Sequence, residues 1–102
     1  MLLREKDKQM LLQIFASVAV PFEVWAYGSR VNGSAHEGSD LDLVIRSADA
    51  TPVPYDAYTE LCEKIKDSNI PILVELRDWA RLPESFHKNI KRRYEVLFNN
   101  QK

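Results

Sequence analysis

Two aspartates separated by one residue are the most chemically suggestive feature of this sequence. Asp40 and Asp42 open a stretch with alternating apolar residues, so in a β-strand both carboxylates project to the same face. With Cα atoms about 6.6 Å apart and an effective dielectric constant of about 20, they repel by roughly 2–2.5 kcal/mol. A divalent cation reverses this repulsion, and Mg²⁺ prefers one or two carboxylates together with phosphate oxygens. A solvated strand edge is the commoner reason for a bare Asp-x-Asp pair.

A glycine–serine pair is the second chemical feature. Gly28 and Ser29 follow the aromatic and β-branched segment 22–27, which predicts a strand, and they precede a predicted short helix. Backbone N–H groups and a hydroxyl at such a turn can cradle a phosphate. The spacing to Gly33 matches a P-loop, but Ser34 stands where a P-loop has lysine, which excludes that class of site. An ordinary turn is the alternative interpretation.

The rest of the pattern predicts the elements that position these residues. Strands are predicted at 22–27, 41–46 and 70–76, and a loop with two prolines at 48–54. Helices are predicted at 4–18, at 29–33 and around Tyr58, Leu61, Cys62 and Ile65, followed by a last helix that starts at Pro83 and turns Phe86, Ile90, Tyr94 and Leu97 inward. We therefore expect an α/β (α+β) fold with a small mixed sheet of about three strands flanked by helices.

Composition limits the classes of protein that the chain can represent. Its 102 residues are 45% hydrophobic and 28% charged, which is typical of one folded domain. The net charge of −1 argues against a nucleic-acid-binding protein. The apolar runs are too short to cross a membrane. Charged residues over 4–8 stand where a signal peptide would have its apolar segment, so we predict no signal peptide. Cys62 is the lone cysteine and cannot form an internal disulfide, so we expect a cytoplasmic protein.

Together, these residues form the pattern Gly-Ser-x10-Asp-x-Asp on strand, turn and strand. The pattern resembles the nucleotidyltransferase superfamily with the DNA polymerase β-like fold and, more narrowly, the minimal nucleotidyltransferase (MNT) family. The resemblance covers most of the chain and implies a single minimal nucleotidyltransferase domain over 1–102. In that family a third strand supplies a third carboxylate, usually an aspartate. Glu75 stands at this place here, and Asp78 is a second candidate, although a helix cap suits it better.

The resemblance also implies a magnesium-dependent active site. Asp40, Asp42 and Glu75 are the implied catalytic residues and ligands of a two-ion Mg²⁺ site, in which the ions stabilise the attacking and leaving oxygens. The residues implied to bind the nucleotide are Gly28, Ser29, Ser39 and Arg30. Ser39 contacts a phosphate or orients Asp40, and we weigh these roles equally. For Arg30 we slightly favour a plain surface position over a contact with phosphate.

A reaction and a partner follow from the same resemblance. The implied reaction transfers a nucleoside monophosphate, AMP from ATP, to a hydroxyl group and releases pyrophosphate. Minimal family members pair with small all-helical HEPN proteins in toxin–antitoxin modules, where the nucleotidyltransferase acts as antitoxin by modifying a partner tyrosine. One alternative is a nucleotide-binding or assembly subunit that neutralises its partner by binding alone. Another is a transferase for small molecules, like the aminoglycoside nucleotidyltransferases. Neither a membrane nor a nucleic acid is an expected partner.

The remaining notable residues receive structural interpretations. Trp25 and Trp79 are expected in the core or an interface, Cys62 on the buried face of its helix, and His36 in a solvated loop. The last predicted helix also carries a basic cluster, which consists of Lys88, Lys91, Arg92 and Arg93. We expect this cluster to be a solvated face, with a partner surface or a tRNA contact as the alternative.

Overall fold

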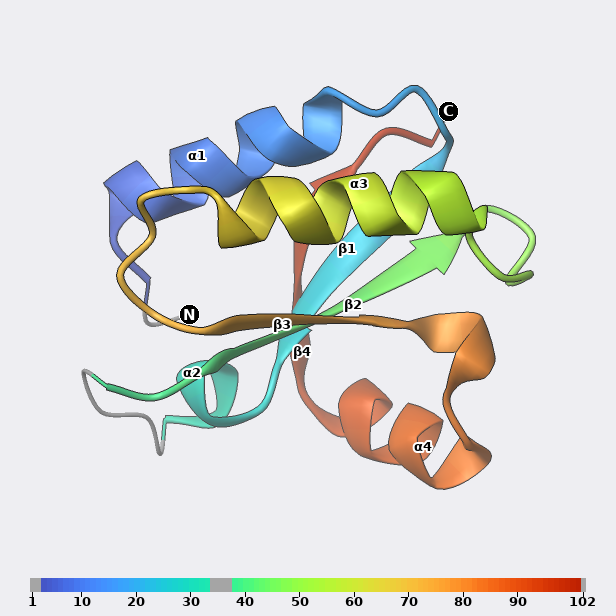
Figure 1. The fold of residues 1–102 in the computed structure, drawn as a ribbon. Helices are drawn as coiled ribbons and strands as arrows, with labels where there is room; N and C mark the ends of the chain where they lie inside the picture. Colours follow the sequence, from blue (N-terminus) through green and yellow to red (C-terminus); the bar gives the residue numbers. More distant parts are fainter. Residues whose placement is uncertain (1–2, 34–37, 102) are drawn as a thin grey trace.

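A computed structural model describes residues 3–33 and 38–101, which form one mixed sheet with helices on both of its faces (Figure 1). In chain order the elements are α1 (Glu5–Ala16), β1 (Phe22–Tyr27), α2 (Ser29–Asn32), β2 (Leu41–Ser47), α3 (Tyr55–Lys66), β3 (Val74–Asp78), the 3-10 turn η1 (Trp79–Arg81), α4 (Glu84–Arg92) and β4 (Tyr94–Asn99). His36, which we expected to be solvated, lies outside the described residues.

The strand order in the sheet is β3-β2-β1-β4. β1 is antiparallel to both β2 and β4, whereas β3 is parallel to β2 and is reached through the crossover helix α3. The register pairs Asp42 with Tyr27 on one side and with Glu75 on the other. This arrangement confirms the predicted α/β class and the mixed sheet.

The two faces of the sheet have different coverings, because side chains alternate along each strand. One face carries Leu41, Leu43 and Ile45 and packs against α1 and α3 to form the main core. The other face carries Trp25 and Val44 and is partly covered by η1 and α4 (Figure 1). Asp42 shares this second face with Val44, so the carboxylate lies on the side that α4 covers only in part.

The last predicted helix is wrong in its second half. α4 ends at Arg92, and Tyr94 and Leu97 belong to β4, which gives the sheet four strands rather than about three. Of the other side chains that we expected to turn inward, Ile90 is buried but Phe86 is 41% exposed. The apolar spacing suited a helix, yet the aromatic and β-branched residues Tyr94, Val96 and Phe98 also suit a strand, and sheet pairing with β1 decides between the two.

The third strand also starts later than predicted. It runs from Val74 rather than from residue 70 and continues to Asp78. Pro71 lies in the segment that was expected to begin the strand, and a proline has no N–H group to donate to a sheet. Leu73 instead accepts a hydrogen bond at its carbonyl from the Leu41 N–H group, at 2.9 Å, where the parallel pairing starts.

Other structural expectations can be compared directly with the structure. Trp25 and Trp79 are both buried, in contact with each other through an edge-on ring arrangement, which confirms their interpretation as core aromatics. Cys62 is partly buried and packs against the main core. The basic cluster is exposed to solvent, as predicted. Within the part of the chain that the structure describes, no helix has the length and apolar character needed to cross a membrane.

Candidate active site

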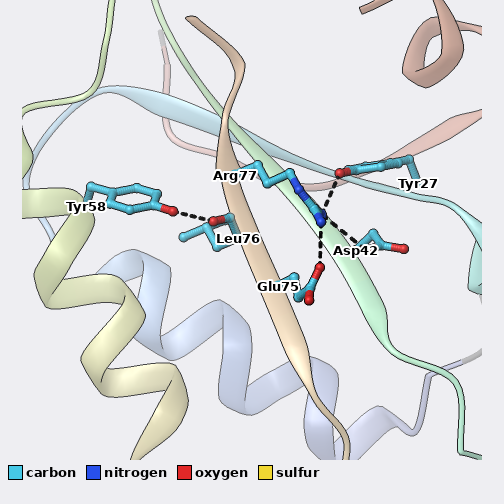
Figure 2. Close-up of polar contacts among 6 residues, drawn as sticks. All are labelled: Tyr27, Asp42, Tyr58, Glu75, Leu76 and Arg77. Atoms are coloured by element: carbon cyan, nitrogen blue, oxygen red, sulfur yellow. Dashed lines mark hydrogen bonds and ion pairs between the residues drawn. The ribbon is translucent and has the colours of Figure 1, made fainter. Parts of the chain in front are cut away.

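Strand pairing brings two of the predicted carboxylates together on the face that α4 covers in part. Asp42 on β2 and Glu75 on β3 are partners in the parallel register. Neighbouring strands lie about 4.8 Å apart, so the two side chains rise from adjacent positions on the same face. Figure 2 shows both carboxylates in contact with the same guanidinium group, that of Arg77. Glu75 therefore stands where the third strand was expected to place a carboxylate.

An arginine that sequence reasoning missed occupies the space between these carboxylates. Arg77 Nη2 donates to Glu75 Oε2 at 2.6 Å, and Nη1 lies 3.3 Å from Asp42 Oδ1 and 3.0 Å from Tyr27 Oη (Figure 2). The guanidinium thus joins residues of β1, β2 and β3. Its position two residues after Glu75 was the available signal, because residues i and i+2 of a strand share a face.

The charges of this cluster do not cancel evenly. Burial is the largest cause that raises the pKa of the Asp42 carboxyl, and the negative charges of Glu75 and Asp40 add to it. Together these effects outweigh the hydrogen bond and positive charge of Arg77, which lower this pKa. Burial lowers the pKa of Arg77, but Tyr27, Asp42 and Glu75 more than offset this, so the net direction is upward. Asp42 therefore remains under-compensated although it contacts a guanidinium, and its anionic form gains from any further positive charge nearby.

Gly28 lies at the predicted turn after β1, and its backbone approaches the Asp42 side chain closely. It has φ +82° and ψ −156°, a conformation that is essentially restricted to glycine. A Cβ atom at this position would lie 2.6 Å from Asp42 Oδ2, which is closer than such contacts occur. The missing side chain therefore leaves bare backbone beside the carboxylate, and Ser29 follows as the first residue of α2.

Arg30 is not the surface residue that we favoured, since its exposed fraction is 6%. Its Nε and Nη2 atoms donate to the carbonyl oxygen of Ser39, at 2.9 and 2.8 Å. Arg30 therefore ties α2 to the segment that enters β2 and brings Ser39 close to the same region. A short-range pattern could not reveal this contact, because the two residues meet only when the sheet forms. Contacts of Arg30 and Ser39 with a nucleotide remain predictions.

The two other candidate carboxylates lie in different places. Asp40 precedes β2 by one residue and is exposed, and its charge reaches Asp42. Asp78 is buried on the opposite face, where its side chain accepts from the N–H groups of Val53 at 2.9 Å and Ala80 at 3.1 Å. The capping role that suited Asp78 is therefore confirmed, and the residue is directed away from the carboxylate cluster.

A surface depression adjoins this cluster. It encloses about 430 Å³ between the turn at Gly28 and helix α4, and its lining includes Tyr27, Arg92 and Arg93. Tyr27 belongs both to this lining and to the contacts of Arg77. Part of the basic cluster thus faces a hollow that opens beside the carboxylates, a combination suited to an anionic ligand.

The donor chemistry of the cluster fits a hard divalent cation. Asp42 and Glu75 offer two carboxylates from adjacent strands, and the lack of a side chain at Gly28 lets the Asp42 carboxylate lie against the backbone of that turn. Among the described residues, no three His, Cys, Asp or Glu side chains already form a metal cage. Mg²⁺ does not require one, since it usually takes one or two carboxylates and completes its shell with water and substrate phosphate.

Comparison with known proteins shows the family to which this chain belongs. The family model described as "Polymerase beta, Nucleotidyltransferase" matches residues 9–102. The chain belongs to this family and is a nucleotidyltransferase, which confirms the resemblance inferred from the Gly-Ser and Asp-x-Asp pattern. The chain is also 34% identical over 100 residues to the probable protein adenylyltransferase MntA of Haemophilus influenzae, an alignment that spans 98% of this chain and 86% of that protein.

Two solved structures share the fold. One, a crystal structure of a toxin–antitoxin with AMP-PNP, has a TM-score of 0.72 and 20% identity and covers 93% of this chain and 75% of its own. The other, a mutant of the toxin–antitoxin MntA–HpeT, has a TM-score of 0.68 and 21% identity and covers 97% of this chain and 76% of its own. Both support the polymerase β-like fold class predicted from the sequence.

Proposed function

We propose that this chain transfers AMP from ATP to a tyrosine hydroxyl of a small all-helical HEPN protein, its partner in a toxin–antitoxin module. The family supports nucleotidyl transfer, and the Haemophilus relative is described as a protein adenylyltransferase. Structural neighbours described as toxin–antitoxin support a protein partner. The pairing of Asp42 with Glu75 beside the bare backbone of Gly28 is the observation that carries the proposal. The chain would act as one minimal domain over 1–102, in the cytoplasm.

Asp42 and Glu75, with Asp40 as a third carboxylate, are the residues that would hold Mg²⁺ in the two-ion arrangement expected for this class. Bound there, the metal would neutralise charge on the phosphate oxygens and on the leaving pyrophosphate. The substitution of glutamate for the usual aspartate at Glu75 keeps the oxygen donor but lengthens the side chain. Its adjacent register with Asp42 keeps both carboxylates within reach of one ligand.

The protein's own residues would bind and orient the two substrates. Gly28 and Ser29 offer backbone N–H groups and a hydroxyl to the β- and γ-phosphates, and Arg92 and Arg93 add positive charge at the neighbouring depression. The hydroxyl oxygen of the acceptor then forms a bond to the α-phosphorus, while the bond from that phosphorus to the bridging oxygen breaks. Pyrophosphate leaves with the electron pair, and the hydroxyl proton passes to a carboxylate of the cluster such as Glu75.

Label transfer from α-labelled ATP to the partner protein, followed by intact-mass analysis, tests this function. We expect the partner to gain whole AMP units in the presence of Mg²⁺, and a Tyr→Phe change at the acceptor to abolish the gain. Asp42→Asn should remove transfer, because the amide keeps the shape but loses the negative charge. Asp67→Asn, at an exposed aspartate after α3, is the matched control and should transfer normally.

Three outcomes would contradict this function or favour an alternative. If Asp42→Asn labels the partner as fast as the wild type, the carboxylate cluster is not the active site. If neither the wild type nor Asp42→Asn labels the partner, but both neutralise its toxicity through a stable complex, the chain is a binding subunit. Transfer of AMP to an aminoglycoside in place of the partner would instead identify a small-molecule transferase.

A further inference from the structure

Arg77 engages the same carboxylate oxygens that the proposed metal site needs. Its guanidinium contacts Asp42 Oδ1 and Glu75 Oε2 at once, at 3.3 and 2.6 Å. We propose that Arg77 is a built-in counter-cation that competes with the divalent metal for Asp42 and Glu75, so that metal enters together with a nucleotide whose phosphates take over the guanidinium. This inference rests on the proposed metal-dependent function.

Charge balance is the reason that metal and guanidinium compete. Two carboxylates at adjacent strand positions repel each other, and the guanidinium removes this repulsion when no metal is bound. In the proposed two-ion site, two divalent ions and a guanidinium would together carry five positive charges against the three carboxylates of Asp40, Asp42 and Glu75. This excess of positive charge repels the guanidinium from the carboxylates. The guanidinium then needs another anion to pair with. A triphosphate is such an anion, and arginine binds phosphate oxygens through two parallel hydrogen bonds.

The surroundings of Arg77 allow this exchange. Its side chain is 36% exposed and stands on β3, at one edge of the sheet. Its guanidinium also donates a hydrogen bond to the hydroxyl of Tyr27, a neutral residue that lines the depression beside Gly28. Figure 2 shows the guanidinium between Tyr27 and the two carboxylates, and in the proposed exchange this partly exposed side chain would turn away from the carboxylates. The expected acceptor is therefore a polyphosphate that lies between the cluster and the depression.

Mn²⁺ binding to the full chain, measured by electron paramagnetic resonance of the free ion, tests the proposal. The wild type should bind Mn²⁺ alone weakly and bind it much more tightly with an ATP analogue that cannot be cleaved at the α-phosphorus. Arg77→Met should bind Mn²⁺ alone about tenfold more tightly, since two partly exposed ion pairs no longer compete. The same variant should lose about tenfold in its affinity for the metal–nucleotide complex, because the phosphates lose their arginine.

Arg46→Met is the matched control. Arg46 lies on the same sheet face, its side chain is 32% exposed, and it pairs with Glu23 at 3.6 Å, away from Asp42. Its Mn²⁺ affinity should equal that of the wild type, with and without nucleotide. If Arg77→Met proves too unstable to purify, Arg77→Gln removes the same charge and keeps a polar side chain at this position. A purely structural role for Arg77 would lower the melting temperature of either variant without raising its affinity for Mn²⁺ alone.

The results separate this inference from the function on which it rests. If the wild type binds the metal–nucleotide complex through Asp42 but Arg77→Met binds Mn²⁺ alone no more tightly, competition by Arg77 is overturned and the proposed function stands. If Asp42→Asn binds the metal–nucleotide complex as well as the wild type, the metal site itself is misplaced and both proposals fail. Tighter binding of Mn²⁺ alone to Arg77→Met, with unchanged binding to Arg46→Met, supports the proposal.

Discussion

The contact between Gly28 and Asp42 gives the sharpest prediction for the site. Gly28→Ala forces a Cβ atom into a backbone conformation that costs about 1–3 kcal/mol for a residue with a side chain. It also places that atom 2.6 Å from Asp42 Oδ2, so the carboxylate must rotate away. Gly33→Ala is the matched control. Gly33 also has a positive φ, +87°, but an added Cβ there meets no atom of the described residues within 4 Å.

The two substitutions should therefore differ in activity more than in stability. Each should lower the free energy of unfolding by about 1–3 kcal/mol, as urea denaturation measures it. Only Gly28→Ala moves Asp42 from its 3.3 Å contact with Arg77 and from its alignment with Glu75. A displacement of about 1 Å at a reacting centre can cost about a hundredfold in rate, so AMP transfer should fall by that order in Gly28→Ala and stay near normal in Gly33→Ala.

A double-mutant cycle isolates the clash from the backbone strain. In an Asp42→Ala background the carboxylate is absent, so Gly28→Ala should lower the free energy of unfolding only through backbone strain. The effects of the two substitutions on the free energy of unfolding should therefore be non-additive by about 1 kcal/mol or more. Strict additivity would show that Gly28 and Asp42 do not press on each other. Equal AMP transfer by Gly28→Ala and Gly33→Ala would refute the reasoning from the site geometry.

Two further predictions concern the parts of the fold that support the site. Ile90 is the buried residue of α4, with 1% exposure, so Ile90→Ala should lower the free energy of unfolding by about 2–4 kcal/mol in urea titrations, while Phe86→Ala should cost much less. Burial raises the pKa of Tyr58, whose hydroxyl donates to the Leu76 carbonyl, to about 12 (Figure 2). Because this folded-state pKa exceeds the ordinary value of about 10, the associated stabilisation is complete below pH ~10 and is lost as the pH rises toward 12. Thermal melts across this range should show a smaller alkaline loss for Tyr58→Phe than for the wild type, and parallel curves would contradict the assignment.

Much of the fold was predictable because its signals are local. Alternation at Leu41, Leu43 and Ile45 indicated a strand with one buried face, and the helical spacing over 4–18 indicated α1. The end of the chain was not predictable in the same way, since 94–97 fits both a helical and a strand pattern. Pairing with β1 decides this case, and a partner strand some 70 residues away leaves no local signal.

The residues of the candidate site also differ in whether a local signal predicts them or only the pairing of distant strands does. The relation between Gly28 and Asp42 came from a motif with fixed spacing, and the structure places the two residues in contact. The adjacency of Glu75 depended on a resemblance, because only the parallel register of β2 and β3 brings it to Asp42. Arg77 was overlooked because its importance depends on the identity of its neighbours on other strands. Arg30 was misplaced because one of its partners is the Ser39 carbonyl, a backbone group that the sequence does not single out.

The place of β3 in the sheet has a consequence for how often the cluster is complete. Asp42 stands on a strand that is paired on both sides, whereas Glu75 and Arg77 stand on a five-residue strand at the sheet's margin. Short edge strands unfold locally more often than the whole molecule unfolds. For the proposed active site, the fraction of molecules in which the cluster is complete therefore depends on the pairing of this short strand, and a contact that stabilises its outer edge would raise that fraction.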